Sequence, residues 1–208
     1  MFLYLWLVKI SSKYIDEAVE QLSSLPGIGK KTALRLVLQM LNRSETEIQQ
    51  FSESFVEMKK MVKKCTSCGN ISDQELCEIC QNPNRDHAQI CVVEDIRDVM
   101  ALESTNYYKG IYHVLGGIIS PMDGIGPADL NISALIEKVQ KEEVKEIIFA
   151  LSTNMEGDTT NFYLFKKLAP FKINITCLSR GVAIGTELQY ADELTLGRSL
   201  INRQPFNL

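Results

Sequence analysis

The sequence predicts an α/β protein in several parts: a helical N-terminal region, a small cysteine module, a parallel-sheet domain and a C-terminal tail segment. Three observations lead to this prediction. Apolar residues recur at helical spacing before residue 64, four cysteines fall within sixteen residues, and short apolar strands then alternate with helices. Continuous apolar strands that alternate with helices are typical of a parallel sheet covered on both faces.

The charge of the chain is unevenly distributed. The 208 residues carry a net charge of −4, yet residues 1–64 hold ten Lys/Arg against seven Asp/Glu, whereas residues 65–208 hold twelve against nineteen. The basic N-terminal part could therefore meet phosphates although the chain as a whole is acidic. A solvated charged face would explain a segment of charge +3 equally well.

The first eight residues are almost all apolar. Eight residues are far fewer than the roughly 20 needed to span a bilayer, and neither a basic region nor a small-residue cleavage site flanks them. We therefore expect a soluble cytoplasmic protein without membrane contact. Met1–Ser11 should either pack against the next helix or have little structure.

Three helices are predicted in the N-terminal region. Residues 12–22 have apolar side chains at helical spacing behind a potential N-cap, Ser12, and residues 30–41 repeat the pattern. A third helix is predicted from Ser44 to Lys64, because Ser44 and Glu47 form the pattern of a capping box.

A Pro/Gly turn, LPGIG at residues 25–29, joins the first two helices. Its glycines permit a tight hairpin and the close approach of another backbone, and the turn opens into a helix N-terminus, which favours an anion. Cationic side chains follow it. This combination indicates a phosphate-binding element that ignores base identity, although a purely structural helical hairpin is the alternative. The candidate DNA-binding residues are Gly27, Gly29, Lys30, Lys31 and Arg35.

The cysteine module, residues 65–80, carries the strongest chemical signal. Two Cys-x₂-Cys knuckles, Cys65/Cys68 and Cys77/Cys80, supply four thiolates for one tetrahedral ion. This spacing favours Zn²⁺ over an iron–sulfur cluster, and four protein ligands leave no open position, so the zinc should be structural. Disulfides are the competing interpretation, disfavoured without a secretory signal. The two remaining cysteines lie in apolar runs and should be buried; they are Cys91 and Cys177.

Beyond the module, the pattern predicts strands at residues 89–93, 111–115, 146–151 and 172–178. Helices are predicted between them at residues 96–103, 132–141 and 158–168, and a Gly/Pro loop at residues 116–128. His87 should be a surface residue and His113, within a strand, a packed or sheet-edge residue. Neither accompanies a nucleophile pattern, so neither supports a catalytic triad.

The order of these parts resembles the RecR family of bacterial recombination mediators. A helix-hairpin-helix, a four-cysteine module and a strand that begins QICVVE are followed by SPMDGIGPADL (120–130), NMEGDTT (154–160), SRGVAIGTEL (179–188) and ADELTLGRSL (191–200). The resemblance covers residues 12–206. It implies a helical region at 1–64, a C4 zinc finger at 65–80, a Toprim domain at 88–183 and a C-terminal segment at 184–208.

Catalytic Toprim members hold Mg²⁺ with a Glu after the first strand and an Asp-x-Asp after a later one. Glu94 stands in the place of that Glu, but Ser152 and Asn154 stand where the two aspartates would be. Two-metal phosphoryl chemistry needs converging carboxylates, so this departure predicts a protein that is not an enzyme. The remaining acidic residues, Glu94, Glu156 and Asp158, could hold a weak ion or contact a partner, or could instead cap helices and satisfy loop backbone.

By this resemblance the chain is a non-catalytic DNA-binding protein of recombinational repair. It would bind single-stranded, gapped or duplex DNA without sequence preference. It would work with RecO and RecF to help load recombinase at gaps, and would assemble as a homodimer or a ring-like homotetramer. Two alternatives remain: a Mg²⁺-dependent Toprim nuclease or primase, and a zinc-containing interaction module that never touches nucleic acid.

Overall fold

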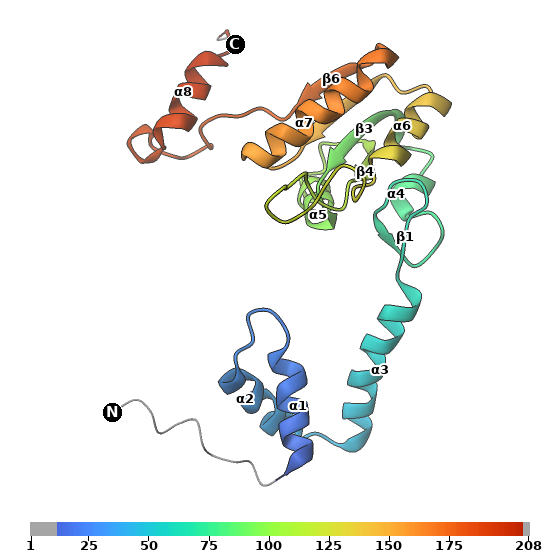
Figure 1. Ribbon diagram of the computed structural model, residues 1–208, viewed down its shortest axis with the longest axis vertical. Helices are drawn as coiled ribbons and strands as arrows, with labels where there is room; N and C mark the ends of the chain where they lie inside the picture. The colour runs from blue at the N-terminus through green and yellow to red at the C-terminus, as the bar shows by residue number, and fades with distance from the viewer. Residues whose placement is uncertain (1–11, 206–208) are drawn as a thin grey trace. The chain divides into compact units, whose positions relative to one another are not determined.

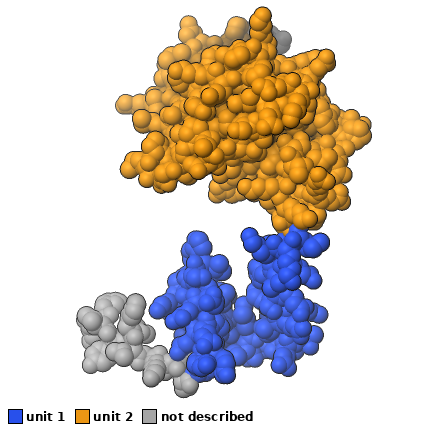
Figure 2. All heavy atoms as spheres, turned by 45° about the vertical axis from the view of Figure 1, so that its right-hand side comes forward, with its two compact units in different colours: residues 1–61 blue, residues 62–208 orange. Residues whose placement is uncertain are grey.

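The computed structural model describes residues 12–205. The predictions for Met1–Ser11 lie outside the described residues. The chain divides into two compact units, residues 1–61 and residues 62–208, which Figure 2 colours separately. None of the helices in the described part is long and apolar enough to cross a membrane.

The first unit is helical, as predicted. Helices α1 (Lys13–Ser23) and α2 (Lys30–Met40) form a hairpin, and α3 (Glu45–Met61) follows (Figure 1). A small core forms between α1 and α2 because their apolar stripes face each other, with Val19, Ala33 and Val37 buried at its centre. The spacing of apolar residues thus predicted both helices to within one residue at each end.

Helix α3 begins with the predicted capping box. The Glu47 side chain accepts a hydrogen bond from Ser44 N–H at 2.8 Å, and Ser44 Oγ accepts one from Glu47 N–H at 3.3 Å. The predicted end at Lys64 is wrong. The helix ends at Met61, because residues 63 and 64 instead pair with the cysteine module as strand β1. No residue of α3 is buried.

The second unit begins with the cysteine module. It contains the short antiparallel strands β1 (Lys63–Lys64) and β2 (Ile71–Ser72) and the helix α4 (Glu78–Gln81). The sheet domain follows. Its strands are β3 (Asp86–Val93), β4 (Gly110–Val114), β5 (Glu146–Ala150) and β6 (Asn174–Cys177), and its helices are α5 (Ile96–Ser104), α6 (Ile132–Lys141) and α7 (Met155–Leu168). A 3₁₀ turn, Ala169–Phe171, closes α7.

The four long strands form one parallel sheet in the order β4-β3-β5-β6, which confirms the predicted class. Ile90 on the central strand β3 pairs with Ile111 of β4 and with Ile147 of β5. Helices α6 and α7 cover one face and α5 covers the other, as the two separate apolar cores show. The carboxyl ends of β3 and β5 are neighbours, so the residues that follow them, Glu94 and Ser152, meet at one sheet edge.

Several details of the sheet domain differ from the prediction. Strand β3 begins at Asp86, three residues before the predicted start, and β6 begins at Asn174, two residues after it. Helix α7 begins at Met155, three residues before the predicted start, because Asn154 Oδ1 caps it by accepting Gly157 N–H at 2.8 Å. Cys91 is buried as expected, but Cys177 is exposed. It ends β6, an outer strand of the sheet, where one side has no neighbouring strand.

The C-terminal segment contains a 3₁₀ turn, Leu188–Tyr190, and helix α8 (Glu193–Ile201). We predicted no helix or strand there from the sequence. Asp192 caps α8, its side chain accepting Thr195 N–H at 2.9 Å. No residue of α8 is buried.

Candidate functional site

The first cysteine knuckle is formed by a tight turn. Cys65 and Cys68 lie between β1 and β2, and the turn is closed by Cys65 N–H donating to Asn70 O at 2.6 Å and Gly69 N–H donating to Cys65 O at 2.9 Å. Gly69 has φ +76°, in the left-handed region that side chains disfavour. The glycine therefore lets the two thiols point to the same side.

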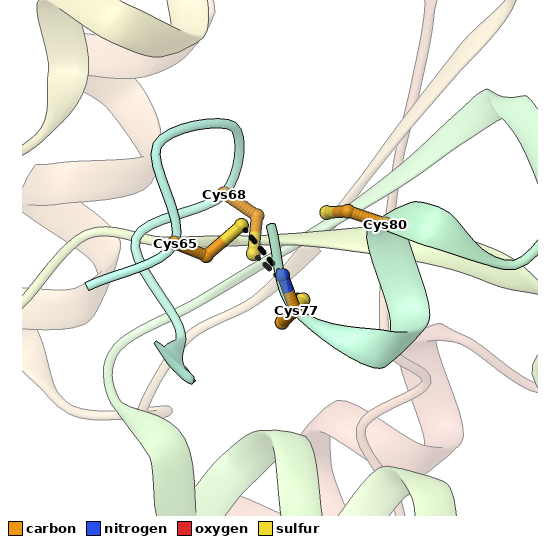
Figure 3. A group of neighbouring side chains, drawn as sticks. All are labelled: Cys65, Cys68, Cys77 and Cys80. Carbon is orange, nitrogen blue, oxygen red and sulfur yellow. Dashed lines mark hydrogen bonds between the residues drawn. The ribbon is translucent and has the colours of Figure 1, made fainter. Parts of the chain in front are cut away.

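The second knuckle is built on α4. Cys77 is the N-cap of this short helix and Cys80 lies within it, so the helical turn brings both thiols together. The backbone N–H of Cys77 also donates to Cys65 Sγ at 3.3 Å, which links the two knuckles (Figure 3).

The four thiols fit one tetrahedral ion. All four cysteines are buried, and their sulfur atoms lie within 4.8 Å of one another. Zn–S bonds of about 2.3 Å place sulfur atoms roughly 3.8 Å apart in a tetrahedron, and the Sγ atoms of Cys68 and Cys77 are 3.6 Å apart. All six cysteines are free thiols, so the disulfide interpretation is wrong. The module therefore presents an S₄ donor set suited to Zn²⁺.

The surroundings of the sulfur atoms favour a thiolate at Cys80. Hydrogen bonds from Cys68 and Ser67, together with the charge of Lys138, lower the pKa of Cys80 to about 5 against the effect of burial. The hydrogen bond with Cys80 and burial raise the pKa of Cys68. Thiolates are the species that zinc binds.

The cysteine module is docked on the edge of the parallel sheet. Val114 N–H at the end of β4 donates to Cys68 O at 2.7 Å. A Cβ on Gly69 would meet Val114 O at 2.9 Å, so only glycine allows this approach. Ile79 of α4 packs against the cysteines and against both cores of the sheet. The module thus covers the outer strand β4 and belongs to the second unit.

The hairpin residues lie together in the first unit. Gly27 has φ +82°, Ile28 N–H donates to Leu25 O at 3.1 Å, and Gly29 is the N-cap of α2. No side chain caps this helix, so the N-terminus of α2 is open to a ligand. Lys31 is exposed in its first turn.

Arg35, one turn further along α2, is also exposed. Together with Lys31 it borders a shallow hollow of about 340 Å³, whose other lining residues are Leu34, Leu38, Gln39 and Asn42. Two cations beside an uncapped helix start form the kind of surface that binds a phosphate. Lys30 lies in the same turn as Lys31 and is exposed.

The Toprim-like acidic residues are held by hydrogen bonds within the chain. Ser152 Oγ donates to Glu94 Oε2 at 2.9 Å. Ser152 stands where catalytic Toprim members have the first aspartate, and it thus binds Glu94, which stands where they have the glutamate. Asn154, in place of the second, caps α7. Glu94 itself caps nothing, because α5 is capped by Asp95 in a capping box with Asp98.

The other two acidic residues are held as well. Ser120 Oγ lies 2.7 Å from Glu156 Oε1. Asp158 pairs with Arg180 and with Arg198 of α8, and the hydrogen bond from Arg180 lowers the pKa of the Asp158 carboxyl. Asp158 therefore ties the C-terminal segment to the start of α7 and is not its cap.

Residue 157, which follows Glu156, must be a glycine because the backbone of another segment lies against it. A Cβ at this position would overlap the backbone oxygen of Ser152. The start of α7 thus packs directly on the backbone that leaves β5, and this close approach sets the positions of Ser152 and Glu156. In residues 12–205, the four cysteines are the one group of three or more His, Cys, Asp or Glu with metal-binding geometry.

The two histidines have different surroundings. His113 is fully buried, with Nε2 2.6 Å from Asn131 O, and burial lowers its pKa to about 4. His87 is exposed. Both placements confirm the expectation.

Sequence reasoning missed Ser120, Arg180, Arg198 and Lys138. Of these, only Lys138 carried a signal: it lies three residues after Leu135, on the apolar side of its helix.

Family models match nearly the whole described chain. They are a RecR helix-hairpin-helix at residues 15–59, a RecR four-cysteine zinc finger domain at 62–82, a Toprim domain at 88–179 and a RecR C-terminal model at 181–204. Together with the buried S₄ set, the zinc finger match shows one structural zinc site per chain.

The chain is also similar to curated proteins named "Recombination protein RecR". It is 56% identical to the protein from Parabacteroides distasonis over 95% of both chains. It is 57% identical to that from Flavobacterium johnsoniae, over 96% of this chain and 97% of the relative. The protein from Porphyromonas gingivalis is 52% identical over 96% of both chains.

Proposed function

The chain belongs to the RecR family of recombination proteins, and we propose that it is a non-catalytic DNA-binding protein that acts with RecO and RecF to help load recombinase at single-strand gaps. The observation that carries DNA binding is the hairpin surface. An uncapped helix N-terminus, with Lys31 and Arg35 exposed beside it, offers backbone N–H groups and two charges to phosphates. We assign DNA contacts to Gly27, Gly29 and Lys30 as well.

The carboxyl edge of the sheet supports the absence of catalysis. Mg²⁺ is a hard ion that needs carboxylates, and the two side chains in place of the family aspartates are a neutral serine and a neutral asparagine. Both are engaged, Ser152 with Glu94 and Asn154 with the N-terminus of α7. We propose that Glu94 and Glu156 contact a partner protein, and that Asp158 holds the C-terminal segment in place through its arginine pairs.

A DNA titration tests the proposal. We expect single-stranded and gapped DNA to bind with a log affinity that falls linearly as log salt rises, with a slope of about −0.7 per phosphate contact on a single strand. Fluorescence anisotropy at several salt concentrations, with Mg²⁺ present, measures the affinity. A denaturing gel of the same samples should show intact DNA, because Glu94, Glu156 and Asp158 do not form a group with metal-binding geometry in residues 12–205.

Cut DNA on that gel would support the alternative, a Toprim nuclease, provided that Glu94→Ala abolishes the cutting. Absence of binding at low salt would contradict direct DNA contact by the hairpin. It would mean that a partner such as RecO delivers the DNA.

We also propose that the chain assembles as a homodimer or ring-like homotetramer through two different surfaces. Helix α3 is apolar on one side although none of its residues is buried; Phe55 is 53% exposed and packs edge-on against Phe51. Helix α8 likewise exposes Leu194, Leu200 and Ile201. Apolar helix faces of this kind usually mark interfaces, and a closed ring built from dimers needs two of them.

Light scattering after size exclusion tests the assembly. Phe55→Glu and Leu200→Glu should each halve the mass of a tetramer, and the double variant should be a monomer, because a buried charge opposes each apolar contact. Met122→Glu, at an exposed loop position, serves as the control and should leave the mass unchanged. A wild-type chain that is monomeric at all concentrations would contradict the proposal.

The domain division we propose is a helix-hairpin-helix region at 1–64, a zinc finger at 65–80, a Toprim domain at 88–183 and a C-terminal segment at 184–208. The place of action that fits a recombination protein is the bacterial cytoplasm, at the nucleoid.

A further inference from the structure

Lys138 is a buried cation on α6. Its side of the helix also carries Leu135 and Val139, which pack in the sheet core, and Lys138 itself is 7% exposed. Lysine is almost never buried without a partner, because removing an ammonium group from water is costly. The position therefore needs a compensating anion.

The described residues provide no carboxylate for it. The one hydrogen bond that Lys138 Nζ makes there is to the neutral hydroxyl Ser67 Oγ, at 2.8 Å. None of the ion pairs among residues 12–205 includes it. The nearest acid on its own helix, Glu137, pairs instead with Lys141 on the exposed side. An ammonium group has three donors, so one neutral acceptor neither satisfies it nor neutralises it.

The four thiols of the cysteine module are the candidates for the missing anion. Ser67 lies between Cys65 and Cys68, so its hydrogen bond places the ammonium beside the first knuckle, where the charge of Lys138 also acts on Cys80 of the second. Four thiolates around one Zn²⁺ carry a net charge of −2. In a buried site such a charge needs nearby donors or cations. The hydrogen bond from Cys77 N–H to Cys65 Sγ compensates only part of the negative charge.

We propose that Lys138 is the counter-ion of the zinc–thiolate centre, held in position by Ser67. It is a positioning residue and not a ligand. It reaches the finger from the sheet domain, 71 residues along the chain from Ser67. Zinc affinity in the finger then depends on the folded sheet domain, and the burial of Lys138 depends on zinc.

The first test compares Lys138→Met with Lys141→Met in the full chain. Methionine fills similar space without charge, and Lys141 is a matched control on the same helix with a side chain 73% exposed. Competition with a chromophoric chelator measures zinc affinity. We expect Lys138→Met to bind zinc about tenfold more weakly, as loss of a residue that supports metal ligands does, and Lys141→Met to match the wild type. An affinity within twofold of the wild type for Lys138→Met would overturn the proposal.

A second readout separates charge from packing, because a variant that merely destabilised the fold would also weaken zinc binding. With Co²⁺ in place of zinc, the energy of the sulfur-to-cobalt charge-transfer band reports how easily an electron moves from a thiolate to the metal. Removing the neighbouring positive charge should move this band to lower energy in Lys138→Met and leave it unchanged in Lys141→Met. A band at the wild-type position would show that Lys138 only packs.

Ser67→Ala completes the set. It removes the hydrogen bonds of Ser67 with Lys138 and with Cys80 but leaves the charge, so its band shift should lie between those of the wild type and Lys138→Met. A shift as large as that of Lys138→Met would mean that the hydroxyl, and not the ammonium, acts on the sulfur atoms.

Discussion

Cys77→Ser is expected to abolish tight zinc binding and to lower the melting temperature of the chain by roughly 10 °C. At free zinc a thousandfold above Kd, binding to the folded state alone contributes about 4 kcal/mol, and each kcal/mol is worth roughly 2–4 °C in a chain of this size. The effect should reach the sheet, because the finger covers β4 through the hydrogen bond from Val114 N–H to Cys68 O. Zinc content by mass spectrometry and calorimetry measure both results.

The substitution isolates the metal ligand from the local fold. Cys77 is the N-cap of α4, and serine is a preferred N-cap, so the helix keeps its start. Cys177→Ser is the matched control, since Cys177 is exposed at the end of β6. Chelator treatment of the wild type should reproduce the shift. A Cys77→Ser chain that retains one tightly bound zinc would show that the four cysteines are not the ligand set.

Lys31→Ala combined with Arg35→Ala is expected to weaken DNA binding by at least roughly a hundredfold, equally for all sequences. A hydrogen bond to a charged group contributes about 1.5–3 kcal/mol, and the double variant can no longer make two such bonds with phosphate. The slope of log affinity against log salt should fall in magnitude by about 0.7 on single strands, and by about 0.9 on duplex, for each phosphate that is no longer neutralised. Anisotropy titrations on DNA of two unrelated sequences measure both effects.

Lys166→Ala with Lys167→Ala is the control, because it removes the same number of positive charges from α7 in the other unit. This variant should keep the wild-type slope. If the slope changes in the control and not in the hairpin variant, DNA lies on the sheet domain and our assignment of the hairpin is incorrect.

The local geometry of both principal sites was predictable from sequence. A Cys-x₂-Cys knuckle and a Pro/Gly hairpin are formed by residues a few positions apart, so the spacing of these residues in the sequence determines the local geometry. The same holds for the capping box of Ser44 and Glu47 and for the strands, whose apolar runs predicted the parallel sheet. Two of the errors arose where strand pairing decided the outcome. Lys63 and Lys64 leave the helix because they pair with β2, and Cys177 is exposed because β6 lies at the edge of the sheet.

By itself, then, the sequence determined the zinc ligands, the hairpin, the class of the sheet and the family. The tertiary structure alone decided what surrounds them. The cysteine module covers β4, and Ser152 binds Glu94. Arginines pair with Asp158, and the ammonium group of Lys138 binds Ser67 in the cysteine module. The physical reason is distance along the chain. Spacing encodes contacts within a turn or two, whereas the partner of a buried charge is chosen by packing among segments tens of residues apart.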